Sequence, residues 1–258
     1  RNRRNILSEE IRKAKKKNKD VSFLIQEAKL NLEKVDDLTN KRKELKDNLV
    51  KCQLEIPNMM HKDVPPGKDS SKNVEIRRVG KIRTFDFPVR NHVNILELNN
   101  FADFDASARA SGKGFYYLKS EFAILNQALI RFTMDFMYKK GYTYIEPPLL
   151  LNEESIYASM NKEAIQESVY DIKGEDLHLI GTAEQPILAM HKDQVLPIEE
   201  LPKKYFSYTM CFRKEIGSHG LNEKGLWRTH HFNKVEQFIF CEPKDSEKLY
   251  DELLQNSE

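Results

Sequence analysis

The sequence is poor in cysteine, since Cys52, Cys211 and Cys241 are the three that occur in 258 residues. They form no CxxC pair and have no paired histidines beside them in the sequence. This argues against a disulfide framework and against a zinc knuckle, and it favours a reducing compartment. We therefore expect Cys211 and Cys241 to pack within a sheet rather than to react, and we assign no metal ligands to this chain.

Long apolar runs are missing as well. No stretch approaches the roughly 18 residues that cross a bilayer, and nothing at the start of the sequence is typical of a signal peptide. The sequence thus predicts a cytoplasmic protein without a membrane partner. A strong net charge is also lacking, since 42 Lys and Arg stand against 40 Asp and Glu, so overall charge does not indicate nucleic-acid binding.

The charge that is present is unevenly distributed. Residues 1–51 hold 16 Lys and Arg against 9 Asp and Glu, a net +7, while the remaining residues sum to −5. Such a basic end suits a polyanionic partner, although a solvated lysine-rich helix face would produce the same composition.

The basic segment also has the pattern of an antiparallel helical hairpin. A first helix runs into a polar turn near Asn18, and Asp20 is placed to cap a second helix that ends before Pro57. Because the first arm is only about half as long as the second, we expect the natural protein to begin upstream of Arg1. Eight of the ten heptad core positions in the second helix are apolar, which is typical of a coiled-coil seam. These positions are Val21, Leu24, Ala28, Asn31, Val35, Leu38, Arg42, Leu45, Leu49 and Cys52.

Residues 56–90 hold four of the ten prolines and are predicted to form a linker that wraps the next domain. A helix over 120–140 follows, with Ser120 as its cap and Gly141 as its end. Because this helix is apolar around most of its circumference, we expect it to be buried, with another subunit as one candidate cover.

Three further elements complete the pattern. "YTYIEPPLLL" predicts a strand interrupted by Pro147 and Pro148, hence an edge or interface strand. "DLHLIGTAEQPILAMH" predicts a strand, a turn and a short helix, with Thr182 at the helix start. The last segment opens a helix capped by Asp245.

A charged hairpin over 205–241 is the most informative feature. Along a first strand over 205–215, alternation places Arg213 and Glu215 on one face, opposite the apolar side chains. Along a second strand over 228–241, one face carries Arg228, His230, Phe232, Lys234 and Glu236, and the other carries Val235, Ile239 and Cys241. The connection over 216–227 is 12 residues long, well beyond the 2–5 residues of ordinary hairpins, so we expect it to contact a ligand or partner.

Two interpretations of these charges stay open at this point. The hairpin could be half exposed, with arginine and glutamate pairing across the strands. Alternatively, guanidinium groups can bind phosphate oxygens, an aromatic ring can stack on a purine, and a carboxylate can bind an ammonium group. The adjacent His230 and His231 face opposite sides of a strand, and we interpret both as structural rather than as metal ligands.

The sequence of the hairpin, "CFRKE…GLWRTHHFNKVEQF", closely resembles motif 2 of class II aminoacyl-tRNA synthetases, and in detail that of the seryl-tRNA synthetase family. Four earlier segments also resemble that family and occur in the same order. They are "IPNMMHKDVPPGKD", "SGKGFYYLKSEFAILNQALIRF", "KGYTYIEPPLLL" and "LIGTAEQPI". The resemblance implies an α+β chain in which an antiparallel coiled-coil hairpin precedes an antiparallel sheet domain with flanking helices. It implies a tRNA-binding arm over 1–55, a linker over 56–90 and a class II catalytic domain over 91–258.

The resemblance also implies roles for particular residues. Arg213 would hold the α-phosphate of ATP, with Arg228 near the phosphates and ribose as a second catalytic arginine. Phe232 would stack on adenine and Glu236 would pair with the α-ammonium of serine. The implied ATP-binding set is Arg213, Lys214, Glu215, Arg228, Thr229 and Phe232. The implied serine-binding set is Thr182, Ala183, Glu184 and Glu236. The implied tRNA-binding set is Arg12, Lys15, Lys16, Lys17 and Lys19.

The implied activity is ATP-dependent activation of L-serine to seryl-adenylate, with Mg²⁺, and transfer of serine to tRNA(Ser) by a homodimer. The family's motif 3 is absent from the sequence, so we expect an incomplete site that activates serine poorly on its own. One rival hypothesis is a paralogue that has kept the fold and acts as an RNA-binding or scaffold protein. The other is an RNA-binding coiled coil on an inert domain.

Overall fold

The structure is a computed structural model that describes residues 2–160, 162–215 and 224–258. It divides into two compact units, residues 1–74 and residues 75–258, which are described separately below. The division falls inside the predicted linker over 56–90. In chain order the elements are α1 Asn2–Lys16, α2 Ser22–Leu54, η1 Ser70–Lys72, α3 His92–Leu98, β1 Ala102–Asp103, α4 Phe104–Ser111, β2 Tyr117–Leu118, α5 Ser120–Lys139, β3 Thr143–Tyr144, β4 Leu150–Leu151, α6 Glu153–Tyr157, α7 Lys162–Ser168, β5 His178–Leu179, α8 Glu184–Met190, η2 Ile198–Glu200, β6 Lys203–Phe212, β7 His231–Phe240, η3 Pro243–Asp245 and α9 Ser246–Ser257.

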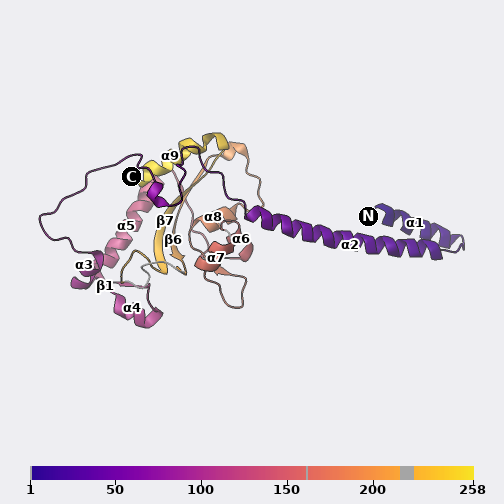
Figure 1. The fold of residues 1–258 in the computed structure, drawn as a ribbon, viewed down its shortest axis with the longest axis horizontal. Coiled ribbons are helices and arrows are strands. Elements are labelled where there is room, and N and C mark those ends of the chain that lie inside the picture. The colour runs from indigo at the N-terminus through magenta and orange to yellow at the C-terminus, as the bar shows by residue number, and fades with distance from the viewer. Residues whose placement is uncertain (1, 161, 216–223) are drawn as a thin grey trace. The chain divides into compact units, whose positions relative to one another are not determined.

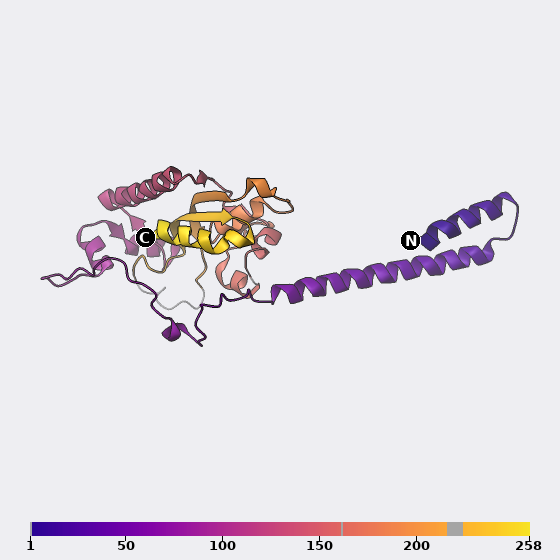
Figure 2. The same cartoon turned by 90° about the horizontal axis from the view of Figure 1, so that it is seen from above.

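The first unit is the predicted antiparallel hairpin of α1 and α2, which Figure 2 shows most clearly. Leu7 of α1 is fully buried between the helices, and Arg3 forms an ion pair with Glu27 of α2. The turn differs slightly from the expectation, because Val21 and not Asp20 occupies the cap position of α2. Asp20 still contributes there, since its Oδ1 accepts the backbone N–H of Ser22 at 2.9 Å.

The predicted seam of α2 is covered for only part of its length. The core positions from Val21 to Val35 are half buried. Beyond them, Leu38, Leu45 and Leu49 have exposed fractions of 67%, 59% and 58%. The heptad pattern therefore predicted the face correctly, and α1 covers the part of that face nearest the turn.

The centre of the second unit is the antiparallel pair of β6 and β7, with β3 parallel to β6 at its other edge. Figure 1 shows α5 on one side of the pair and α6, α7 and α8 on the other. On the α5 side, Met137, Tyr142 and Phe206 are buried together with side chains of β7 and α9. The opposite face is buried as well, because Ser207, Thr209 and Cys211 are each at most 2% exposed.

Two smaller clusters support the elements around this sheet. One gathers buried side chains of β4, α6 and α7 and of the residues that directly follow α7 and β5, namely Leu151, Ile156, Ile165, Val169 and Ile180. The other joins α3, β1 and α4 through Leu96, Ala102 and Phe104, with Leu226 packed against it. Among the described residues, no helix is long and apolar enough to cross a membrane.

The structure corrects several local expectations. β6 ends at Phe212 and β7 begins at His231, so both strands are shorter than predicted. Glu215 has a φ of +52°, which ends the extended conformation and the alternation of faces before that residue. Neither Ser120 nor Asp245 caps its helix through its side chain. The prediction that the helix over 120–140 is buried is wrong within this chain.

The exposed side of α5 is strongly apolar. Its buried side chains are Ile130 and Met137, whereas Ile124 is 71% exposed. The other large apolar side chains exposed on α5 are Leu125, Leu129, Phe132 and Tyr138. The sequence correctly predicted that α5 is apolar around most of its circumference. Within this chain, however, only one side of the helix is buried.

A polar cluster attaches α9 to the sheet. The hydroxyl of the buried Tyr142 donates to Oε1 of Glu252 at 2.8 Å, and Nζ of Lys204 lies 2.7 Å from both Glu252 oxygens. The hydrogen bond from Lys204 is the largest cause that lowers the pKa of the Glu252 carboxyl. The ionised carboxylate therefore stabilises the fold, fully above the unfolded-state pKa of about 4.3. That contribution is lost as the pH falls through the lower folded-state pKa.

We predict that Glu252→Gln lowers the free energy of unfolding by about 1 kcal/mol at pH 7, because the exchange removes the charge from the pair with Lys204. The difference from the unsubstituted chain should shrink as the pH is lowered below about 4. Urea unfolding at pH 7 and at pH 3.5 measures it. Asp251→Asn, at an exposed carboxylate of the same helix, is the control, and an equal loss in both variants would contradict the assignment.

Candidate functional site

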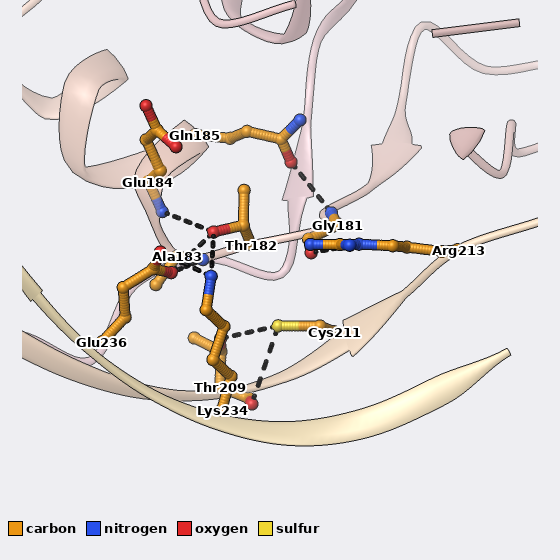
Figure 3. Close-up of polar contacts among 10 residues, drawn as sticks. All are labelled: Gly181, Thr182, Ala183, Glu184, Gln185, Thr209, Cys211, Arg213, Lys234 and Glu236. Atoms are coloured by element: carbon orange, nitrogen blue, oxygen red, sulfur yellow. Dashed lines mark hydrogen bonds and ion pairs between the residues drawn. The ribbon is translucent and has the colours of Figure 1, made fainter. Parts of the chain in front are cut away.

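The register of β6 and β7 places the candidate site on one face of the sheet. Cys211 is paired with Phe232, Thr209 with Lys234, and Ser207 with Glu236. Because directly paired residues of antiparallel strands share a face, these side chains all lie on one face of the sheet, and those of Lys234 and Glu236 reach the turn between β5 and α8. Figure 3 shows that turn, over 181–185, lying across the face.

Glu236 connects the sheet to the turn. Its Oε2 accepts the Thr182 hydroxyl at 2.6 Å and the Ala183 backbone N–H at 3.1 Å. Its Oε1 accepts Nζ of Lys234 at 2.5 Å, and the same ammonium donates to Thr182 Oγ1 at 3.1 Å. The Glu236 side chain is 16% exposed. A nearly buried carboxylate therefore receives an ammonium, a hydroxyl and a backbone donor, and these contacts offset the cost of removing it from water.

Arg213 follows β6 and approaches the other end of the turn. Its Nε donates to the Gly181 carbonyl at 3.2 Å, and its guanidinium carbon lies 5.1 Å from the centre of the Phe232 ring. Within the part of the chain that the structure describes, no hydrogen bond engages the two terminal amino groups of Arg213. These groups are donors in the geometry that matches carboxylate and phosphate oxygens.

Arg213 lines two cavities. The first, the turn pocket, has a volume of about 260 Å³ and is lined by Ser159, Met160, Ser168, Val169, Gly181, Thr182, Glu184, Gln185 and Arg213. The second, the strand-end pocket, has a volume of about 240 Å³ and is lined by Arg213, Glu215, Leu226, Trp227, Arg228, Thr229 and Phe232. A guanidinium shared by two pockets can bind a group of the molecule in each of them at once.

The strand-end pocket brings together most of the predicted ATP-binding residues. Arg228 forms an ion pair with Glu215, with 3.2 Å between Nη1 and Oε2, and the Glu215 side chain is only 10% exposed. Thr229 is buried and donates its hydroxyl to the His231 carbonyl at 2.8 Å. Lys214 is the exception, because its Nζ lies 3.1 Å from Oδ2 of Asp171 and it lines neither pocket.

The predicted serine-binding residues gather at the turn. Thr182 and Glu184 line the turn pocket, and Ala183 is buried and contributes its backbone N–H to Glu236. The predicted tRNA-binding residues lie in the other unit, all exposed, at the end of α1 and in the turn that follows it. Most of the predicted contact loop, residues 216–223, lies outside the described residues. The site assignments themselves stay predictions.

Of the residues predicted to be structural, Cys211, His230 and His231 are packed, whereas Cys241 follows the end of β7 and is only partly buried. Cys211 is fully buried, and burial raises the pKa of its thiol, so it stays protonated. Nδ1 of His230 lies 2.9 Å from the Tyr170 hydroxyl. The ring of His231 stacks on Tyr116 with 4.7 Å between centres. Among the described residues, no group of His, Cys, Asp and Glu side chains could hold a metal ion.

Sequence reasoning missed two residues of the site. Lys234 was placed on the correct face by alternation, but nothing indicated that its ammonium would contact both Glu236 and Thr182. Gln185 is fully buried, and its Oε1 accepts the Gly181 N–H at 2.9 Å. Gln185 thereby holds the turn whose carbonyl contacts Arg213, and a single glutamine in a short helix gave no signal of this.

Comparisons with known proteins give a consistent result. Residues 1–60 match the family model described as the seryl-tRNA synthetase N-terminal domain. Residues 167–258 match that of the tRNA synthetase class II core domain (G, H, P, S and T). The chain is 41% identical to a serine–tRNA ligase of Methanoregula boonei over 258 residues, which is all of this chain and 61% of that protein. It is 36% identical to the serine–tRNA ligase of Nitrosopumilus maritimus, over 98% of this chain and 60% of that protein.

Solved structures agree with these relatives. The seryl-tRNA synthetase from Pyrococcus horikoshii complexed with ATP is similar with a TM-score of 0.84 and 34% identity, over 98% of this chain and 61% of that one. The cytoplasmic serine–tRNA ligase from Naegleria fowleri in complex with AMP has a TM-score of 0.80 and 28% identity, over 99% of this chain and 61% of that one. The chain thus spans about three fifths of the length of the relatives it matches.

The contact of Gln185 with Gly181 generates a stability prediction. Gln185→Leu keeps the side chain's approximate size but leaves the buried Gly181 N–H without its acceptor. We expect a loss of about 1–3 kcal/mol in the free energy of unfolding, measured by urea denaturation. Gln255→Leu, at an exposed position of α9, is the control. If both variants are equally stable, Gln185 does not hold the turn.

Proposed function

Because the chain belongs to the seryl-tRNA synthetase family, we propose that it forms the part of a serine–tRNA ligase that binds ATP and L-serine and activates the serine. The observation that carries this proposal is the position of Arg213 between the turn pocket and the strand-end pocket. Activation joins a carboxylate to the α-phosphorus of ATP, so both reactants must meet at one place. A guanidinium shared by two adjacent pockets suits that requirement.

In this proposal, ATP binds in the strand-end pocket. Its α-phosphate faces Arg213, Phe232 offers a ring face to adenine, and Arg228 supplies a second cation, 52% exposed at the pocket's edge. The relatives from Pyrococcus horikoshii and Naegleria fowleri were solved with ATP and with AMP, which supports a nucleotide at the corresponding place. In the present structure the guanidinium of Arg213 lies over the ring of Phe232, so the proposed phosphate donor and the proposed adenine platform are neighbours in one pocket.

L-Serine binds in the turn pocket, with its ammonium toward Glu236 and its carboxylate toward Arg213. Oε1 of Glu236 receives a hydrogen bond from Lys234, and a carboxylate oxygen can accept two. Thr182, whose hydroxyl is held by Glu236, lines the pocket directly. The positive charge of Arg213, which lines the pocket, and the negative charge of Glu236, which contacts Thr182 of the pocket wall, match the opposite charges of an amino acid.

The chemistry follows from these positions. A serine carboxylate oxygen attacks the α-phosphorus, the bond to the β-phosphate oxygen breaks, and pyrophosphate leaves with the bond's electron pair. Arg213 stabilises the charge that develops on the α-phosphate oxygens. The terminal ribose hydroxyl of the tRNA then attacks the seryl carbonyl and displaces AMP. Mg²⁺ belongs to the proposal as the ion that accompanies ATP, and because no described cluster could hold a metal, no step is assigned to an ion held by this chain.

The remaining partners are proposed on separate grounds. The exposed lysines at the end of α1 suit the phosphates of tRNA(Ser). The exposed apolar side of α5 suits a second copy of the chain in a homodimer, which would cover Ile124, Leu125 and Phe132. The three unpaired cysteines suit the cytoplasm.

Serine-dependent exchange between ATP and pyrophosphate, measured with the full-length protein, tests the proposed activation. Arg213→Ala should lower kcat/KM of exchange about 100- to 1000-fold, because the charge on the α-phosphate loses its donor. Lys248→Ala removes an exposed cation elsewhere in the same unit and should leave exchange unchanged. Absence of serine-dependent exchange in the unsubstituted protein would reject the proposal and favour the non-catalytic paralogue.

The tRNA-binding assignment is tested with a pair of lysines. Replacing Lys16 and Lys17 by alanine should weaken tRNA(Ser) binding and lower its salt dependence, by about 0.7–0.9 in the log–log slope for each phosphate that is no longer neutralised. Exchange should stay unchanged in this variant, whereas aminoacylation should show a raised KM for tRNA. A variant lacking the exposed Lys173 and Lys248 matches the change in charge. Equal weakening in the two variants would show that α1 has no specific role.

A further inference from the structure

The wall of the strand-end pocket is attached to α3 and α4, two helices that lie far earlier in the chain. Nζ of Lys224 lies 3.2 Å from Oε1 of Glu97 in α3 and 2.9 Å from Oδ1 of Asp105 in α4. Leu226 packs against the buried cluster of α3, β1 and α4. Residues 224–227 are therefore docked by charge and by apolar contact onto a surface that does not belong to the sheet.

His92, the first residue of α3, makes both polar and ring contacts with this wall. Its Nε2 lies 3.0 Å from the backbone nitrogen of Leu226, and its Nδ1 lies 3.2 Å from Nε1 of Trp227. The imidazole and indole rings also meet edge to face, with centres 5.9 Å apart and an angle of 87° between them. Both Leu226 and Trp227 line the strand-end pocket, whereas His92 itself does not.

The two contacts of the His92 ring compete with each other. Both partners are N–H donors, so each ring nitrogen would have to act as an acceptor. A neutral imidazole has one N–H and one acceptor nitrogen, so at any moment it can accept only one of the two hydrogen bonds. One tautomer of the ring therefore accepts the backbone N–H of Leu226, and the other accepts the indole N–H of Trp227.

Gly225 allows the close approach of the two segments. A Cβ atom at this position would lie 2.7 Å from Nε2 and 3.2 Å from Cε1 of His92, and its φ of +154° is one that L side chains rarely adopt. The chain thus passes against the imidazole at a distance that only glycine permits. The contact between His92 and residues 225–227 is therefore specific in both backbone conformation and space.

We propose that His92 is a positioning residue for nucleotide binding, which acts by fixing Leu226 and Trp227 and, through them, Arg228. This inference rests on the proposed function in that the molecule in the strand-end pocket is ATP. Arg228 follows Trp227 directly, and its ion pair with Glu215 joins two residues that line the pocket. Because a shift of Trp227 moves the backbone of Arg228, the position of His92 sets the place of one of the two arginines that face the phosphates.

The test uses the full-length protein with His92→Ala, His92→Gln and His92→Asn, and measures the KM for ATP and the KM for serine by pyrophosphate exchange. His92→Ala should raise the KM for ATP roughly 2- to 12-fold, the factor that one neutral hydrogen bond supplies. The KM for serine should stay unchanged, since His92 has no contact with the turn pocket. Asn94→Ala, at an exposed position of the same helix, is the matched control.

The two amide variants distinguish the hydrogen bonds. A glutamine side chain places its oxygen near the position of Nε2 and should restore the KM for ATP if the bond to Leu226 is the one that matters. An asparagine side chain reaches only as far as Nδ1 and should restore it if the bond to Trp227 matters. Trp227→Phe should then abolish the benefit of asparagine, and it should leave that of glutamine intact.

Several outcomes overturn the inference. An unchanged KM for ATP in His92→Ala, or an equal rise in the KM values for ATP and serine, would show that His92 does not position the nucleotide pocket. Failure of all three variants to fold, or an equal defect in all three, would assign His92 a purely structural role. Calorimetric measurement of the Kd for ATP keeps the tests separate: absent exchange in the unsubstituted protein rejects the proposed function, while an unchanged Kd in His92→Ala rejects only the role of His92.

Discussion

The antiparallel pairing of β6 with β7 is the constraint on which the whole candidate site depends. Because Thr209 lies opposite Lys234 and Ser207 opposite Glu236, the charged side chains of β7 project from the face that the 181–185 turn crosses. A slip by one residue would send Glu236 into the apolar layer beneath α5 and would break its contacts with Thr182 and Ala183. The buried side chains on both faces, among them Phe206 and Cys211, make such a slip costly.

The same pairing explains why a buried carboxylate is tolerated. Glu236 receives donors from Lys234, Thr182 and Ala183, so the cost of removing its charge from water is offset locally. This arrangement also fixes the turn from the side opposite to Gln185. The turn is consequently held at both ends, and its Gly181 carbonyl is available to orient Arg213. The register of the sheet thus fixes the turn, and the turn in its place orients the guanidinium of Arg213.

The sequence predicted those features that depend on local periodicity. Strand alternation identified Phe232, Lys234 and Glu236 as sharing a face, and heptads identified the seam of α2. The end of β6 was missed because the left-handed backbone of Glu215 has no unambiguous signal in its side chain. The exposure of α5 was missed because apolarity predicts burial without saying which surface provides the cover. The contacts of Gln185 with Gly181 and of His92 with Leu226 and Trp227 are tertiary, so no short window of sequence contains them.

The central claim is that Arg213 serves the turn pocket and the strand-end pocket together. A crystal structure of the full-length protein with a non-hydrolysable analogue of seryl-adenylate tests this claim most directly. The account predicts the terminal amino groups of Arg213 within about 3 Å of the analogue's phosphate oxygens, with the seryl ammonium beside Glu236 and the adenine on Phe232. An analogue bound away from both pockets, or one that leaves the guanidinium of Arg213 without contact, would contradict it.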